Sequence, residues 1–159
     1  MEKYFVQEDL LKAKKKKMIS PLYACLWMDG KAKDAAEFYC SIFPNSKILS
    51  ENPMVVIFQL NGTKFMCLNG GPEYKFNEAI SHVIECETQN EIDHFWNKLS
   101  EGGEEGKCGW LKDKFGMSWQ VVPKILGKLM SNPDTAPKAM YAFMQMKKFD
   151  IEKLLLAVN

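Results

Sequence analysis

The sequence contains no arginine: all 21 of its basic residues are lysines. The planar fork with which arginine clamps a carboxylate, a phosphate or a guanine base is therefore missing. The net charge is only +1. Residues 1–18 carry six lysines against three acids, so this segment is +3 and the remaining body is −2. Such a body is poorly suited to nucleic acid, and we expect no nucleic-acid partner.

Long apolar runs are also missing. No stretch approaches the roughly 18 to 20 residues of a membrane helix, and the N-terminal lysines have no apolar stretch behind them. We therefore expect no membrane partner and no secretory signal. The five cysteines are odd in number, and no two have the C-x-x-C spacing of a zinc site. This pattern favours reduced thiols and a cytoplasmic location.

The first 18 residues differ in character from the rest of the chain. They end in a run of lysines, after which Met18 opens the first strand-like segment. Such a run can tether a protein to an acidic surface. The alternatives are a solvated arm, a short helix, or an extension upstream of an older start at Met18. We treat residues 1–18 as a basic N-terminal extension.

The chain has 159 residues, 47% of them hydrophobic, which suits one compact domain or two small halves that share one core. The first half, residues 19–72, predicts a strand, a helix and three further strands. Asn61 and Gly62 separate two apolar segments and are the two-residue signal of a type I′ hairpin. The expected elements are a strand at 19–28, a helix at 31–43, and strands at 46–50, 54–60 and 63–68.

The second half, residues 79–123, repeats this order. A strand at 79–86 precedes a helix that Thr88 and Glu91 open as a capping box. The apolar residues of that helix recur at helical spacing on one face. A second hairpin completes the unit. The repetition predicts two modules of one type.

The chain turns helical after the second hairpin, and residues 124–159 are expected to form a C-terminal helical segment. Thr135 and Asp150 are candidate N-caps. The methionine-rich face of the middle helix can dock a partner, or it can pack in the core or a dimer interface. The expected helices are at 124–131, 136–148 and 150–158.

Several ordered runs together resemble one known family. They are Trp27-x-Asp29-Gly30, Phe38-Tyr39 with Ile42-Phe43-Pro44-Asn45-Ser46, Leu68-Asn69-Gly70-Gly71-Pro72, and Gly102 to Asp113 followed by Phe115-Gly116 and Ser118-Trp119-Gln120-Val121-Val122-Pro123. Over residues 19–156 the chain resembles PhnB-like proteins, the 3-demethylubiquinone-9 3-methyltransferase-like family of the glyoxalase/bleomycin resistance/dioxygenase (vicinal oxygen chelate) superfamily.

The resemblance implies an α+β fold of two βαβββ modules with C-terminal helices. It also implies a homodimer and a cleft lined by strands of both modules. Many members of the superfamily hold a metal ion in that cleft. Their ligands are typically His or Gln from the first strand of each module and Glu from the last.

The chain is short of ligands for such a metal, because it has only two histidines. His94 lies on the polar face of the second predicted helix, away from any cleft. His82 stands on the first strand of the second module, and Gln120 stands near the place of the terminal glutamate. First-row metals prefer three or four His, Cys, Asp or Glu ligands. We therefore expect no metal and no cofactor.

The resemblance and the missing ligands predict a protein that binds a small molecule in a metal-free cleft. His82 is the candidate catalytic residue, since an imidazole can act as a general base, although an interior histidine is the simpler interpretation. The candidate cleft residues are Trp27, Cys67, Asn69, His82, Trp110, Trp119 and Gln120.

Two other classes of function stay open. One is an enzyme, either a metal-dependent lyase, isomerase or dioxygenase, or the methyltransferase that the family label names. The sequence lacks the glycine-rich first turn that S-adenosylmethionine enzymes commonly place after a strand. The other class is an interaction module that uses the C-terminal helices or the lysine arm.

Overall fold

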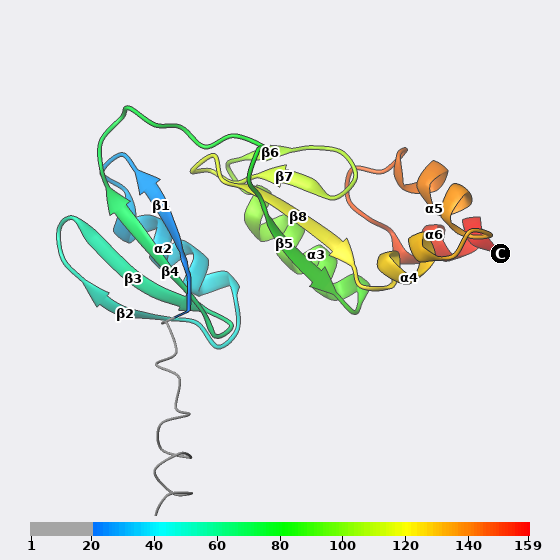
Figure 1. Ribbon diagram of the computed structural model, residues 1–159, viewed down its shortest axis with the longest axis horizontal. Coiled ribbons are helices and arrows are strands. Elements are labelled where there is room, and N and C mark those ends of the chain that lie inside the picture. Colours follow the sequence, from blue (N-terminus) through cyan, green and yellow to red (C-terminus); the bar gives the residue numbers. More distant parts are fainter. Residues whose placement is uncertain (1–20) are drawn as a thin grey trace, which may run out of the picture.

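The computed structural model describes residues 21–159, so the predicted basic extension 1–18 lies outside the described residues. The described chain forms two four-stranded sheets, each accompanied by one helix, and then three C-terminal helices. Figure 1 shows these three parts in a row, with α2 and α3 each behind its own sheet. The predicted α+β fold of two βαβββ modules with C-terminal helices is confirmed.

The first sheet has the strand order β1-β4-β3-β2, in which β1 and β4 are parallel and the other pairs are antiparallel. The predicted hairpin at Asn61 and Gly62 is confirmed, since both have positive φ angles, 43° and 86°. The elements are β1 (Ala24–Met28), α2 (Ala32–Ile42), β2 (Lys47–Glu51), β3 (Val55–Leu60) and β4 (Thr63–Asn69).

The second sheet repeats the order as β5-β8-β7-β6, again with one parallel pair, β5 and β8. The capping box is confirmed: the Thr88 side chain accepts from the Glu91 backbone N–H, and the Glu91 carboxylate accepts from that of Thr88. The elements are β5 (His82–Cys86), α3 (Gln89–Ser100), β6 (Glu104–Glu105), β7 (Trp110–Lys112) and β8 (Ser118–Pro123).

The C-terminal helices are α4 (Ile125–Ser131), α5 (Ala136–Phe143) and α6 (Ile151–Val158). Asp150 caps α6 as predicted, because its carboxylate accepts from the Lys153 backbone N–H. Thr135 is the N-cap residue of α5 as predicted, but its side chain makes no capping hydrogen bond, since its hydroxyl donates to the carbonyl of Leu129, 2.7 Å away. None of the described helices is long and apolar enough to cross a membrane.

Helix α5 ends five residues earlier than predicted, at Phe143. The carbonyl groups of residues 146 and 147 instead accept hydrogen bonds from the backbone of module two. The backbone N–H groups of Cys108 and Gly109 donate to Met146 and Lys147 over 2.8 Å. These inter-segment bonds replace the helical ones, and periodicity within the segment gave no sign of them.

The core lies where each helix covers one face of its sheet. In module one the covered face carries Leu26, Val56 and Phe58, all at most 5% exposed. Residues between them on the same strands point to the opposite face and are at least partly exposed. We call these uncovered faces the open faces. Their residues include Cys25, Trp27, Ile57 and Met66 in module one and Val83, Trp110, Lys112 and Gln120 in module two.

One buried carboxylate joins the two modules. Asp113, in the β7–β8 turn, is 2% exposed. It accepts hydrogen bonds of 2.8 Å from the hydroxyl of Tyr39 on α2 and from the indole N–H of Trp119 on β8. Burial raises the pKa of Asp113, while its hydrogen bonds favour the charged form. Burial and the neighbouring carboxylate raise the pKa of Tyr39 well above its usual value, so its hydroxyl stays a donor.

Candidate functional site

The predicted cleft residues divide between the two sides of the sheets. Strand register sets this division, because successive side chains alternate in direction. His82 pairs with Trp119 on the helix-covered side of module two, whereas Val83 pairs with Gln120 on the open face. Trp110 also pairs with Gln120 and therefore shares that open face. The structure does not bring the predicted residues together in one cleft.

Two of the predicted residues have structural roles. Cys67 is fully buried beneath α2, and burial raises its pKa to about 12, so it offers neither surface nor thiolate to a ligand. The Asn69 side chain accepts from the Ala32 backbone N–H at the start of α2 and donates to the Pro53 carbonyl, both over 2.9 Å. Both side chains are thereby engaged within module one.

Two of the three indole or amide candidates on the open faces are also engaged in hydrogen bonds. The Trp27 indole donates to the carbonyl of Gly71 over 2.8 Å. The Gln120 amide donates to the hydroxyl of Ser81 over 2.9 Å. Both side chains are thereby held against the segment that connects the modules. Each is only partly buried and keeps some surface on its open face.

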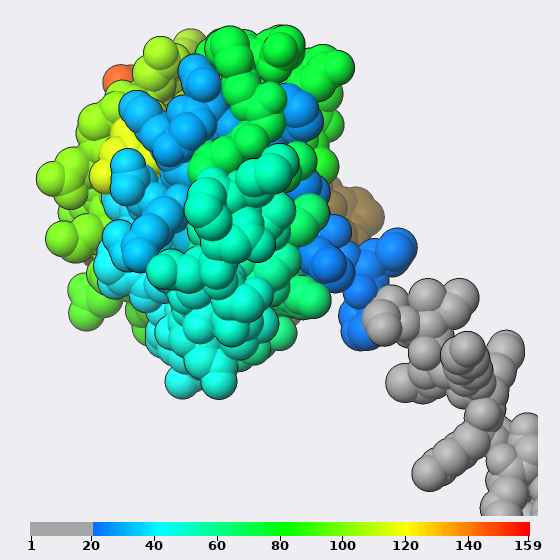
Figure 2. Space-filling model, turned by 90° about the vertical axis from the view of Figure 1, so that its left-hand side faces the viewer, coloured from blue at the N-terminus to red at the C-terminus, as the bar shows by residue number. Residues whose placement is uncertain are grey.

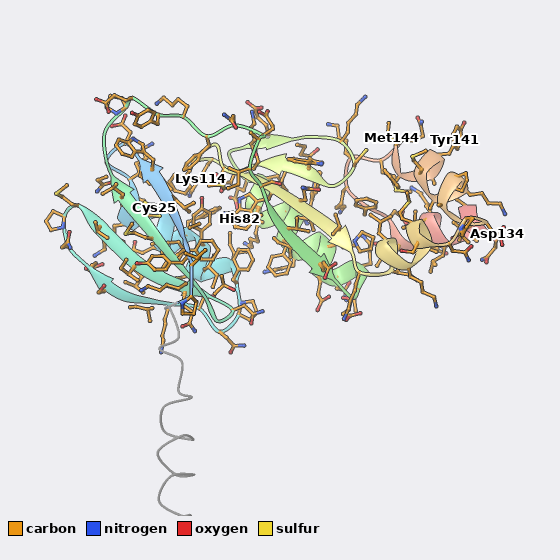
Figure 3. The ribbon with its side chains drawn as sticks, viewed as in Figure 1. Cys25, His82, Lys114, Asp134, Tyr141 and Met144 are labelled. Atoms are coloured by element: carbon orange, nitrogen blue, oxygen red, sulfur yellow. The ribbon has the colours of Figure 1, made fainter. Side chains whose placement is uncertain are left out.

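His82 and Trp119 border a hollow of about 900 Å³ between the two modules. Figure 3 shows His82 at this junction. The His82 ring lies between two aromatic rings, with centroid distances of 5.2 Å to Phe65 and 5.2 Å to Trp119. Phe43 and Phe95 extend this aromatic wall, with their ring centroids 5.1 Å apart. We call this space the His82 hollow.

The imidazole of His82 has no hydrogen-bond partner among residues 21–159, and the aromatic rings of Phe65 and Trp119 flank it. Burial lowers the pKa of His82, and the charge of Asp113 opposes that shift. A neutral imidazole offers one N–H donor and one acceptor nitrogen. The side chain can therefore hydrogen-bond a bound molecule or exchange a proton with it.

The position of His94 corrects the prediction that it lies away from any cleft. Its ring also borders the His82 hollow. Its Nε2 atom lies 3.0 Å from the carbonyl oxygen of Ile42, the last residue of α2. The polar face of α3 turns toward module one, which the helical pattern alone could not indicate.

The hollow runs along the free edge of β5. Residues 82–85 all border it, although they point alternately to opposite faces. Among the described strands, β5 pairs only with β8 and β1 only with β4. The free edge of β5 thus lies beside the hollow.

The donors on the open faces do not fit the metal centre that the superfamily implies. On the open faces, the donors of the first and last strands are Cys25, Glu85 and Gln120, next to the apolar Met66 and Val83. Only Cys25 and Glu85 are ligands of the preferred types, and they belong to different modules, so the set falls short of the three or four ligands that a first-row metal prefers. Within residues 21–159 no group of three or more His, Cys, Asp or Glu side chains could hold a metal ion.

Sequence reasoning missed two groups that define the junction. One is the Tyr39–Asp113 contact, which spans 74 positions in sequence. The other is the aromatic wall of Phe43 and Phe95, which the helical pattern assigned only to a generic core. The only signal in the sequence was that the pairs Phe38-Tyr39 and Phe95-Trp96 fall at corresponding positions of the two predicted helices, and this signal covers Tyr39 and Phe95 but not Phe43 or Asp113.

Comparison with known proteins gives a family match. The family model for 3-demethylubiquinone-9 3-methyltransferase matches residues 20–122. A PhnB protein from Bacillus cereus is 32% identical, with a TM-score of 0.60, over 65% of this chain and 99% of that chain. No curated protein matches this chain.

More distant structures share the fold. A protein from Pseudomonas aeruginosa is 17% identical with a TM-score of 0.56, over 67% of this chain and 98% of that chain. The fosfomycin resistance protein FosX from Listeria monocytogenes, complexed with Mn(II) and sulfate, is 16% identical with a TM-score of 0.52. That match covers 72% of this chain and 98% of FosX. Similarity at these identities concerns the fold alone.

Proposed function

The chain belongs to the 3-demethylubiquinone-9 3-methyltransferase family, the PhnB-like branch of the vicinal oxygen chelate superfamily; from this premise we propose that it binds a small, partly apolar molecule in the His82 hollow without a metal ion. The observation that carries the proposal is the unpartnered imidazole of His82 within an aromatic wall. Ligand sites are typically mostly apolar, with a few polar groups that fix orientation.

The volume and the wall chemistry define the class of ligand. A space of about 900 Å³ is within the usual range for a small-molecule site. Phe43, Phe65, Phe95 and Trp119 suit an apolar or aromatic body, and His82 suits one hydroxyl, carbonyl or amide group. His82 is also the group we expect to act as general base if the bound molecule reacts.

Replacing His82 with leucine is expected to reduce retention of the bound molecule at least about tenfold. The change removes the hydrogen bond from the imidazole to that molecule and the flat shape of the ring. Native mass spectrometry of the protein purified from cell extract measures this retention. Gln120→Leu is the matched control, because Gln120 lies on the open face of the same sheet. It should retain the molecule as the unmodified chain does.

Two outcomes would contradict the proposal. Loss of the molecule in Gln120→Leu but not in His82→Leu would move the site to the open face. Stoichiometric nickel, zinc, manganese or iron in the purified protein, detected by plasma mass spectrometry, would show that donors other than those considered above hold a metal.

We also propose that the protein is a homodimer joined at its free strand edges. Exposed hydrophobic residues flank both edges: Leu22 is 97% and Tyr23 43% exposed beside β1, and Ile80 is 61% exposed beside β5. Val83 within β5 is 57% exposed. Unpaired edges with apolar flanks favour strand addition from a second chain. A partner strand on β5 would also lie beside the His82 hollow.

Val83→Lys is expected to weaken the dimer at least about tenfold, because a lysine on an edge strand opposes strand pairing. Sedimentation velocity over a range of concentrations measures the dissociation constant. Leu156→Lys replaces another exposed apolar residue, on α6, and should leave the constant unchanged. A monomeric unmodified chain at high concentration would rule out this assembly.

Methyl transfer, which the family description names, is the alternative function. Each sheet has only one parallel pair, unlike the doubly wound parallel sheet that S-adenosylmethionine enzymes commonly use. Titration calorimetry with S-adenosylmethionine separates the two functions. Tight binding would favour methyl transfer, whereas no heat of binding would favour the binding function proposed above.

We also propose a cytoplasmic location for the protein, based on the state of its thiols. All five cysteines are free. Burial raises the pKa of Cys67 to about 12 and that of Cys86 to about 11, so both stay protonated and unreactive. A fold that uses no disulfide among its cysteines suits a reducing compartment.

A further inference from the structure

We infer that a second hollow binds small flat anions, each consisting of an aromatic ring that bears a carboxylate or phosphate group. This hollow lies between the start of α2, the segment that connects the modules and the β7–β8 turn. Its volume is about 200 Å³, and Trp27, Lys31, Tyr74, Lys75 and Lys114 are among its lining residues. We call it the Trp27 hollow. It shares no lining residue with the His82 hollow and goes beyond the function proposed there.

Three distant parts of the chain form this hollow. Lys31 precedes α2, Lys75 belongs to the segment that connects the modules, and Lys114 lies in the β7–β8 turn. Figure 2 shows the green connecting segment beside the blue segment of module one, with the yellow-green part of module two next to them. Figure 3 shows Lys114 at the junction of the modules. The folded chain thus places three lysines around one space.

The aromatic wall of the hollow is fixed in position. The Trp27 indole donates to the Gly71 carbonyl over 2.8 Å, and Tyr74 meets the ring edge-on with centroids 4.9 Å apart. Gly70 lies directly against the indole: a Cβ atom there would come within 2.2 Å of the ring. A ring held by three contacts can stack on a flat ligand without losing further side-chain freedom.

The charge of the hollow is positive. Three lysines line it against one acid, Asp29, which leaves +2. None of these lysines forms an ion pair with the described residues, whereas Lys33 and Lys112 do. Lys114 instead lies over the Phe38 ring, 4.2 Å from its centroid. The ammonium groups are therefore available to an anion that enters the hollow.

The size and the wall specify the ligand further. A hollow of about 200 Å³ has room for a single ring with its acid group and is below the usual range for drug-sized ligands. Without arginine, recognition relies on point charges, so carboxylate and phosphate are both accepted. The aromatic wall favours a ring over a free inorganic ion.

Phenyl phosphate and benzoate are the probes that test this site. Titration calorimetry with the full chain should show binding with a dissociation constant of about 1 mM or lower, weakening as salt is added. Lys114→Gln should weaken phenyl phosphate binding about fivefold, since it removes one nearby positive charge. Lys75→Gln should do the same, and Trp27→Leu should weaken both probes.

Lys98→Gln is the matched control, because Lys98 is an exposed lysine on α3 outside the hollow. It should bind phenyl phosphate as the unmodified chain does, and so should His82→Leu. Equal binding by Lys114→Gln, Lys75→Gln and the unmodified chain would overturn the inference. Equally tight binding of inorganic phosphate would overturn the role of the ring, and the absence of any heat with either probe would overturn the site.

Discussion

Replacing Asp113 with alanine is expected to lower the free energy of unfolding by about 3–5 kcal/mol. Each carboxylate oxygen serves two donors. One accepts from Tyr39 and Trp119 over 2.8 Å, and the other from the backbone N–H groups of Phe115 and Met117 over 2.8 and 3.1 Å. Alanine leaves all four donors, three of them in buried hydrogen bonds, without this acceptor. Urea denaturation monitored by tryptophan fluorescence measures the loss.

Asparagine at position 113 should be intermediate, with a loss of about 1–3 kcal/mol, because only one of its two terminal atoms accepts hydrogen bonds. Asp134→Ala is the matched control: Asp134 is exposed at the α4–α5 turn, and the change should stay within about 0.5 kcal/mol. If Asp113→Ala were as mild as Asp134→Ala, the junction of the modules would not depend on this carboxylate.

Sequence patterns predicted the elements of the fold because each pattern is local. The Asn61-Gly62 turn and the Thr88–Glu91 capping box depend on residues within one or two turns of each other. The order of strands and helices followed from such signals, and the family resemblance supplied the pairing of the strands into two modules.

The face on which a strand residue lies was not predictable in the same way. Residues 82–85 alternate, and Val83 and Ile84 on the two faces are both apolar, so hydrophobicity does not distinguish the covered face. A shift of one residue exchanges the faces, so sequence patterns group His82 with Gln120 although their side chains point to opposite faces. The sequence patterns predicted the correct strand for His82, but only the pairing register of that strand determines the sheet face on which the side chain lies.

The arrangement of the modules also lay beyond sequence patterns. It depends on contacts between segments far apart in the chain, such as that of Tyr39 with Asp113. Both hollows form at this junction, from residues that have unremarkable local patterns. This is why Lys31, Lys75 and Lys114 did not stand out among the 21 lysines.

Gly109→Ala is expected to destabilise the fold by about 2–5 kcal/mol, through two causes that add. Gly109 has a φ of +81°, where a side chain costs about 1–2 kcal/mol. A Cβ atom there would also lie 2.6 Å from the Val121 carbonyl oxygen and 2.7 Å from the ring of Phe149. Phe149 is 1% exposed and cannot move away without disturbing the C-terminal segment.

Two other glycines separate these causes. Gly116 has a φ of +86°, and a Cβ atom there would meet nothing within 4 Å, so Gly116→Ala should cost only the backbone strain of about 1–2 kcal/mol. Gly127 lies in α4 with open space around it, so Gly127→Ala should stabilise the chain by about 0.5–1 kcal/mol. Urea denaturation of the three variants ranks them. Equal losses for Gly109→Ala and Gly116→Ala would mean that the C-terminal segment is not packed against Gly109, and that its docking on module two contributes little to stability.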